Sequence, residues 1–223
     1  MITIFTTIMQ PLLRCRRWAL WPALAVLTGC TNALVVDADF PKPITAPIDI
    51  TMAVVYDEQM TKFVYEEQSK SRDRWQIGVG EAHEHLFKEV FEPLFRDSIS
   101  LKTVEEAKNY PQIDLLLIPK INEFQYSSPR ETRINIYEVW IKYNMQVYNP
   151  DGELVADWIM SAYGKTPSAF LQSKEEAMHQ AVVVALRDLG ASLTTGFARV
   201  PEIRSWLEEH QASASTTAAD TGQ

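Results

Sequence analysis

The densest group of potential metal ligands in the sequence is Glu81, His83, Glu84 and His85. A catalytic zinc site needs about three protein ligands, held in place by further hydrogen bonds. On a helix, His83 and His85 are two positions apart and point to different sides, so only Glu81 and His85 share a face. An acidic first helical turn, which the helix dipole favours, accounts for the same residues. We therefore expect no metal ion and no other cofactor.

A second short motif, Gly164-Lys165-Thr166, has the ending of a phosphate-binding P-loop. The motif needs a glycine where the chain has Ile159, and Pro167 stands where its helix should already run. The Gly-x-Ser-x-Gly turn of serine hydrolases is absent from the sequence. Paired carboxylates for glycoside hydrolysis are neither excluded nor suggested. We predict that the protein binds no nucleotide and is not an enzyme.

Cys30 is one of only two cysteines in the chain. It follows a basic stretch with three arginines and a short apolar run, Trp18–Val26. That order is typical of a secretory signal peptide, and the run is too short to span a bilayer permanently. A buried helix of a cytosolic protein is the alternative, which is disfavoured because residues 1–29 contain no Asp or Glu.

The four residues Leu27-Thr28-Gly29-Cys30 resemble the lipobox of bacterial lipoproteins at every position. The resemblance implies that residues 1–29 are removed as a signal peptide and that the Cys30 thiol carries a diacylglycerol. It also implies acylation of the new amino group, which makes the anchor stable. Thr31, in place of the aspartate that retains such proteins in the inner membrane, implies the periplasmic side of the outer membrane of a Gram-negative bacterium. A plain secretory cleavage site is the alternative.

The remaining composition limits the possible partners. Cys15 lies in the signal peptide, so the mature chain has no free thiol or disulfide once Cys30 is lipidated. The net charge of −8 is diffuse, which argues against nucleic acid and against adsorption to anionic lipid through a basic patch. The expected partners are the membrane, through Cys30, and an envelope protein or a second copy of this chain.

The mature chain divides into three parts by composition. Residues 30–47 contain the lipidated cysteine and three prolines, and we expect an extended tether. Residues 48–209 are predicted to form a single periplasmic domain. Residues 210–223 are small and polar, and we expect a disordered tail.

Hydrophobic spacing predicts the elements of the domain. A helix with an aromatic stripe begins at Glu81 and is kinked or ended by Pro93. The pair Ser173 and Glu176 forms a capping box that opens a second helix, which we expect to weaken at Gly190, and a short helix starts at Pro201. Strands are predicted over 48–57, 74–80, 98–104 and 113–124.

The clearest pattern is a long hairpin around the turn Asn149-Pro150-Asp151-Gly152. The strand before the turn alternates with a strict period of two residues, which is typical of a strand with one buried face. The predicted buried residues are Val139, Ile141, Tyr143, Met145 and Val147 on the first strand, and Ala156, Trp158, Met160 and Ala162 on the return strand.

Trp140 and Tyr148 lie on the opposite face of this hairpin, among charged and amide side chains. With Tyr126 and Tyr137 from nearby positions they form the candidate interaction surface. Aromatic residues mixed with polar ones are enriched at protein interfaces, and they also stack on sugar rings. A second core, in which the two helices cover this face, is the interpretation that we favour over a protein interface and over a glycan platform.

These elements predict an α+β fold, an antiparallel sheet with a long C-terminal hairpin and two main helices packed on one face. The order is similar to that of the periplasmic domains of the CsgG, LpoB and TolB amino-terminal group, without shared motif residues. We expect a non-enzymatic accessory or assembly subunit of a cell-envelope complex. A glycan- or small-ligand-binding lipoprotein is the alternative, and an envelope hydrolase is the second.

Overall fold

The computed structural model describes residues 31–168 and 172–220. The predicted signal peptide and the lipidated Cys30 lie outside the described residues. The helices and strands of the described residues belong to one unit, which begins at Asn32.

The centre of the fold is a five-stranded sheet in the order β5-β2-β6-β7-β8. Strands β6, β7 and β8 are antiparallel, whereas β2 pairs in parallel with both β5 and β6. The α+β class is confirmed, but the sheet is mixed rather than antiparallel, because helical crossovers return the chain to the same end of the sheet. The strands are β2 (Ile48–Val55), β5 (Phe95–Leu101), β6 (Leu115–Ser127), β7 (Ile136–Tyr148) and β8 (Leu154–Pro167).

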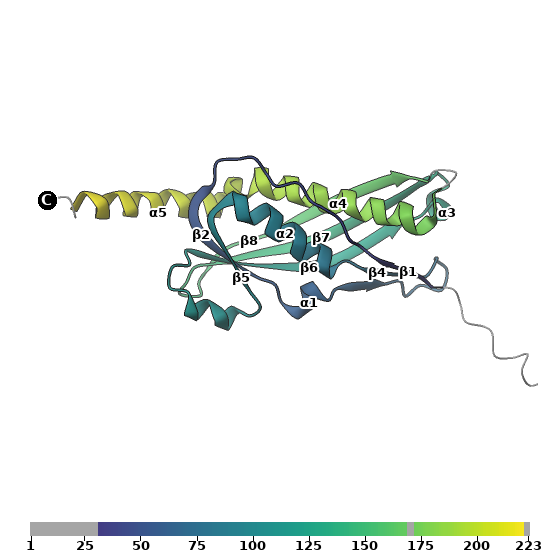
Figure 1. The fold of residues 1–223 in the computed structure, drawn as a ribbon, viewed down its shortest axis with the longest axis horizontal. Helices are drawn as coiled ribbons and strands as arrows, with labels where there is room; N and C mark the ends of the chain where they lie inside the picture. The colour runs from purple at the N-terminus through teal and green to yellow at the C-terminus, as the bar shows by residue number, and fades with distance from the viewer. Residues whose placement is uncertain (1–30, 169–171, 221–223) are drawn as a thin grey trace, which may run out of the picture. The chain divides into compact units, whose positions relative to one another are not determined.

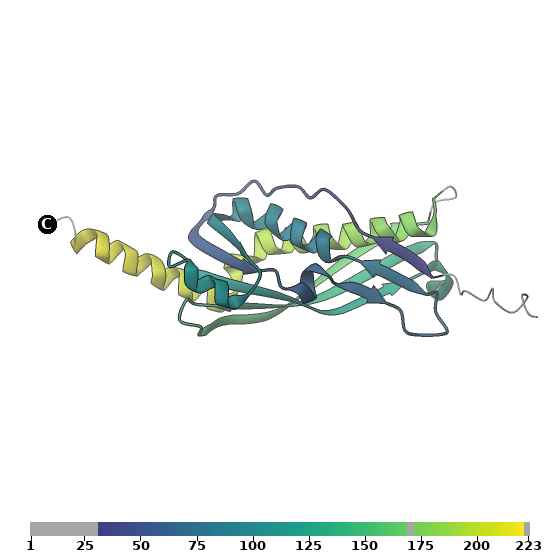
Figure 2. The ribbon, with the colours of Figure 1, turned by 60° about the horizontal axis from the view of Figure 1, so that its bottom comes forward.

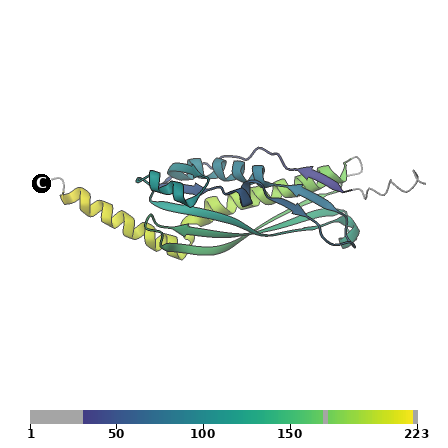
Figure 3. The same ribbon diagram turned by 90° about the horizontal axis from the view of Figure 1, so that it is seen from below.

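Two long helices, α2 (Gly80–Leu94) and α4 (Lys174–Gly196), lie on the same side of this sheet, as predicted (Figures 1 and 3). Helix α2 ends directly after Pro93, and Ser173 caps α4 by accepting from the Glu176 amide, at 3.0 Å. The prediction that α4 weakens at Gly190 is wrong. Gly190 lies inside α4 against Leu86 of α2, where the missing side chain lets the two helices approach closely.

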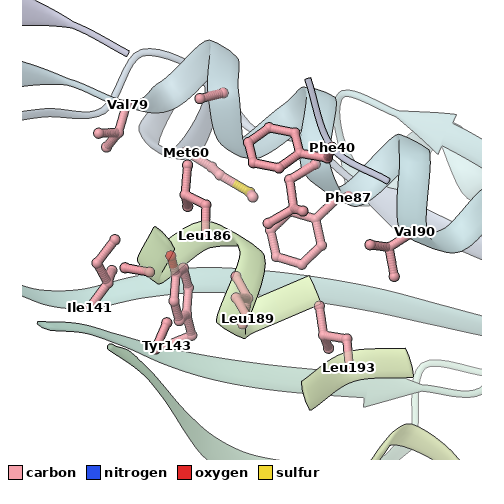
Figure 4. Packing of buried hydrophobic residues seen from close by; sticks show 14 of the residues in the cluster. Phe40, Met60, Val79, Phe87, Val90, Ile141, Tyr143, Leu186, Leu189 and Leu193 are labelled. Atoms are coloured by element: carbon pink, nitrogen blue, oxygen red, sulfur yellow. The ribbon is translucent and has the colours of Figure 1, made fainter. Parts of the chain in front are cut away.

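The main core lies between these helices and the inward face of the sheet (Figure 4). Its aromatic and aliphatic side chains come from every layer, so each apolar stripe is covered by another element. The hairpin residues predicted to point inward are buried here or packed against the core. The positions seen in Figure 4 include Phe40, Met60, Val79, Phe87, Val90, Ile141, Tyr143, Leu186, Leu189 and Leu193.

A smaller sheet in the order β1-β4-β3 flanks the main one. Strand β1 (Asn32–Val35) pairs in parallel with β4 (Trp75–Gly78), and β3 (Val64–Glu66) pairs antiparallel with β4. The short helix α1 (Glu58–Thr61) precedes β3. The strand predicted around Trp75 therefore exists, but in this second sheet.

The tether predicted over residues 30–47 is wrong for residues 32–42. After β1 the chain crosses α4 and α2 in extended form (Figure 2), with Val36 and Phe40 buried in the core. Lys42 pairs with Glu92 of α2 at 2.5 Å, and the Asp39 carbonyl accepts from Arg187 of α4 at 3.4 Å. The prolines do exclude a helix here, but apolar residues between them dock the segment onto the helices.

The disordered tail predicted from residue 210 is also wrong as far as residue 220. A turn of 3-10 helix, η3 (Phe197–Arg199), leads into α5 (Pro201–Asp220), which extends beyond the sheet (Figure 1). Ile203 is buried, and Trp206 is packed against the main core. Alanine has the highest helix propensity, so the small residues after 210 continue the helix.

A second, smaller core lies on the outward face of β2 and β5, near the 3-10 helix η2 (Val104–Asn109). The last short helix, α3 (Pro129–Thr132), joins β6 to β7. Among the described residues, one helix is long and apolar enough to cross a membrane: Lys174–Arg199, which contains α4. Half of its apolar window is buried inside the protein, against β7 and β8, so it is the central core helix.

Candidate functional site

The structure separates the four aromatic residues of the predicted surface. Tyr126 and Tyr137 are buried, and both meet the ring of Trp75 edge to face at 6.4 Å between centroids. Tyr148 is half-buried in the outward core beside η2. The prediction of an exposed surface is therefore wrong for these three residues. The small second sheet covers Tyr126 and Tyr137. The alternation of the hairpin could have shown this side for Tyr137, which is two residues before the inward Val139, but not for Tyr126.

Trp140 is the member of the predicted surface that remains exposed, at 38% of its area. Its partner is Tyr163, the residue directly opposite on β8, with ring centroids 5.2 Å apart. Tyr163 is 36% exposed and its hydroxyl donates to Glu138 at 2.6 Å, which raises the pKa of Tyr163 to about 12. Tyr163 is not among the residues predicted from the sequence. The alternation of the return strand would have placed it on the outward face, because the preceding Ala162 points inward.

Two neighbouring rows of side chains run across strands β6, β7 and β8, and Trp140 is the middle residue of the first row. In the first row Gln125, Trp140 and Tyr163 are neighbours on β6, β7 and β8. In the second row Glu123, Lys142 and Ser161 hold the same places. We call the shallow cavity between these rows the Trp140 pocket. It measures about 240 Å³ and is lined by Glu123, Gln125, Trp140, Ile141, Lys142 and Ser161.

The polar groups of the Trp140 pocket are partly fixed by one another. The Gln125 amide donates to one Glu123 carboxylate oxygen at 2.5 Å. Glu138, held by Tyr163, stands on the other side of Trp140. The pocket therefore presents an aromatic platform with acceptors and one ammonium donor at its edge.

A second hollow, which we call the Phe197 groove, lies on the inward side of β8 at the end of α4. Its volume is about 290 Å³. Phe197 is buried and meets Trp158 edge to face at 6.2 Å, while Trp158 and Met160 are half-buried. The groove is lined by Trp158, Met160, Ser192, Leu193, Gly196, Phe197, Arg199 and Val200.

The Phe197 groove borders the last strand of the sheet. Strand β8 pairs with β7 on one side only, and on its other side the Tyr163 amide donates to Asp188 of α4 at 3.0 Å. Aromatic residues, methionine and arginine are the types enriched in the centre of protein interfaces. Trp158, Met160 and Arg199 supply them around this groove.

The densest potential metal ligands in the sequence are Glu81, His83, Glu84 and His85. His83 is fully buried, with its Nδ1 2.7 Å from the Val79 carbonyl oxygen and its Nε2 2.5 Å from the Tyr143 hydroxyl. Burial lowers the pKa of His83 to about 4, against the smaller opposite effect of the Val79 carbonyl. His83 is thus a neutral core residue. In the described part of the chain, no three His, Cys, Asp or Glu residues are grouped to hold a metal ion.

A cluster of three charged residues joins the small sheet to β6. Arg72 pairs with Glu67 at 2.7 Å and with Glu131, and its guanidinium lies 4.2 Å from the centre of the Tyr126 ring. The hydrogen bond to Glu131 raises the pKa of Arg72 and lowers that of Glu131. Because each charge meets an opposite one, the cluster serves to connect the elements.

The motif Gly164-Lys165-Thr166 has a structural use. A side chain at Gly164 would collide with the backbone of α4 at Ala181 and Ala185. The glycine is therefore required where the helix lies closest to β8, and its neighbours form strand rather than a phosphate-binding loop.

Comparison with known proteins gives a likeness in fold. No family model and no curated protein matches the chain. Protein XCC0632 from Xanthomonas campestris, of family DUF330, matches with a TM-score of 0.52 at 9% identity, over 78% of this chain and 99% of its own. At that identity the two share a fold and no more.

Several other solved neighbours are lipoproteins. A minor lipoprotein from Acinetobacter baumannii matches 69% of this chain and 91% of its own, at 7% identity and a TM-score of 0.34. Lipoprotein GNA1162 from Neisseria meningitidis matches 65% of this chain and 100% of its own, at 11% identity and a TM-score of 0.29. At these TM-scores the two likenesses carry no argument about function.

Proposed function

We propose that the protein is a lipid-anchored, non-enzymatic accessory or assembly subunit of a cell-envelope complex. The lipobox ending at Cys30 supports an anchor on the periplasmic side of the outer membrane. Only Thr31 separates Cys30 from β1, and a chain reaches at most about 3.6 Å per residue. Such an anchor therefore holds the domain close to the membrane surface, without a long tether.

The observation that carries the proposal is the Phe197 groove. It is an apolar hollow beside the last strand of the sheet, with Trp158, Met160 and Arg199 at its walls. An apolar side chain of a protein partner that enters it would bury both surfaces and gain the usual hydrophobic stabilisation. The partner is an envelope protein, and a second copy of this chain is the other occupant that the experiment can reveal.

Gly196→Arg blocks the groove without disturbing the core. A side chain at Gly196 meets no other atom within 4 Å, so the variant should fold normally. Thr195→Arg is the matched control, since Thr195 is exposed and does not line the groove. The two variants introduce the same charge at adjacent positions.

The experiment is affinity purification of the tagged full-length protein from native membranes in mild detergent, with mass spectrometry of the bound proteins. We expect one stoichiometric envelope protein with the wild type and with Thr195→Arg, and at least about a tenfold loss with Gly196→Arg. Equal recovery with both variants contradicts a role for the groove. Light scattering shows whether the occupant is instead a second copy, because Gly196→Arg would then be monomeric.

Two further outcomes test the remaining parts of the proposal. Cys30→Ala should move the protein from the membrane to the soluble fraction, and retention in the membrane would contradict the anchor. Hydrolytic turnover of envelope polysaccharide by the purified protein would contradict a non-enzymatic role.

A further inference from the structure

We propose that the Trp140 pocket binds one ring of a neutral saccharide. This inference does not depend on the Phe197 groove. Trp140 and Ser161 point to the outward side of the sheet, whereas Trp158 and Met160 of the groove point inward. Since neighbouring residues of a strand face opposite ways, the two sites lie on opposite faces of the sheet.

The platform of the pocket is the Trp140 ring. Its electron-rich face attracts the slightly positive C–H groups that line one side of a pyranose ring. Tyr163 packs against Trp140 with its ring tilted by 36°, and is fixed through the bond from its hydroxyl to Glu138. Both rings are thus held in place before a ligand arrives, which lowers the entropy cost of binding.

The edge of the pocket suits hydroxyl groups. Each sugar hydroxyl both donates and accepts, so its recognition needs donors and acceptors side by side. Glu123 accepts, Lys142 donates and Ser161 does both, all in the row next to Trp140. The volume of about 240 Å³ is below the 300–1,000 Å³ of pockets that enclose drug-sized ligands, and it suits one exposed ring of a polymer.

The charges favour a neutral sugar. Glu123 and Glu138 stand on the two sides of Trp140 and repel a carboxylate or phosphate on the ligand. The pocket lining contains no arginine, the residue that binds such groups through two hydrogen bonds, and Lys142 is its one cation. A protein interface would place its apolar residues at the centre, as the Phe197 groove does.

The test is calorimetric titration of the full-length protein in detergent with cellohexaose, a neutral glucose oligomer. Trp140→Ala removes the platform, and we expect at least about a tenfold loss of affinity. Lys142→Met keeps the length of the side chain and removes the donor, and we expect a smaller loss of about threefold. Leu154→Ala is the control, because Leu154 is exposed on β8 and does not line the pocket.

Three outcomes would overturn the proposal. These are no heat of binding with the wild type, equal binding by Trp140→Ala, or tighter binding of an acidic galacturonate oligomer than of cellohexaose. Loss of the protein partner by Trp140→Ala, with no saccharide binding, would make the pocket part of a protein interface instead. Gly196→Arg should bind cellohexaose as the wild type does, which separates this inference from the proposed function.

Discussion

The two faces of strand β7 carry aromatic residues that differ in burial. On the inward face Tyr143 is completely buried, and its hydroxyl bonds to His83 at 2.5 Å. On the outward face, three positions away, Trp140 is 38% exposed and packs against Tyr163. The larger and more hydrophobic ring is the one left in solvent. Residue type therefore does not decide which aromatic residue belongs to the core.

The covering helices make the difference. Helices α2 and α4 lie over the inward face, and the glycine at position 164 brings α4 onto β8 (Figure 3). Burial on that side imposes two constraints: the side chains must pack closely, and buried polar groups need hydrogen-bond partners. The outward face around Trp140 has neither constraint.

The largest expected effect is that of Gly164→Val on the covered side. A side chain there collides with the backbone of α4, which can only yield if the helix moves. We expect a loss of about 4 kcal/mol or more in the free energy of unfolding, measured by urea denaturation. Ser161→Val puts the same side chain on the outward face of the same strand, where we expect a change within about 0.5 kcal/mol. Similar losses in the free energy of unfolding for both variants would contradict the claim that the covered face is the more sensitive one.

A second effect concerns the pH dependence of stability. His83 has a pKa of about 4 when folded, because burial disfavours its charged form, and about 6.5 when unfolded. As the pH falls below 6.5 the unfolded chain binds a proton that the folded chain does not, so stability is lost until the pH reaches the folded pKa. Between pH 6.5 and 5 we expect a loss of about 1.6 kcal/mol.

The histidine responsible can be identified by two variants. Denaturation curves of His83→Gln should lose most of this pH dependence, while those of His85→Gln, a partly exposed histidine two residues further along the same helix, should keep it. An unchanged slope in His83→Gln would show that another group titrates.

The smallest expected effect is that of Trp140→Ala on stability. A cross-strand aromatic pair on an open face contributes about 0.2–1 kcal/mol, and we expect a loss in that range. Phe87→Ala removes a smaller ring from α2, in the core over the covered face, and should cost about 3–5 kcal/mol. If Trp140→Ala is nearly as stable as the wild type but has lost saccharide binding, the outward residue has a role in binding and the covered residue a role in stability. A loss above about 2 kcal/mol would instead make Trp140 a structural residue.

Local patterns in the sequence predicted much of this fold. Alternation around Tyr143 predicted the inward face of the hairpin, and Gly152 takes the positive φ of 84° that its turn requires. Ser173 marked the start of α4, and Pro93 the end of α2. Each of these features depends on residues that are close together in the sequence, so it can be predicted from the sequence alone.

Other features depend on segments far apart in the sequence. Phe40 looked like part of a tether, and Tyr126 like part of a surface, until the helices and the small sheet covered them. The parallel pairing of β2 had no signal of its own, because its alternation is the same in either direction. The candidate site was predicted at Trp140 and missed at Tyr163.

The sequence alone determined the periodic elements, the turns, the caps and the motif that ends at Cys30, since each follows from the chemistry of adjacent residues. Only the tertiary structure decided which elements cover each face, and thus that the small sheet buries Tyr126 whereas Trp140 and Tyr163 stay partly exposed. Covering a face requires a partner element brought from elsewhere in the chain. That choice depends on the packing of the whole domain.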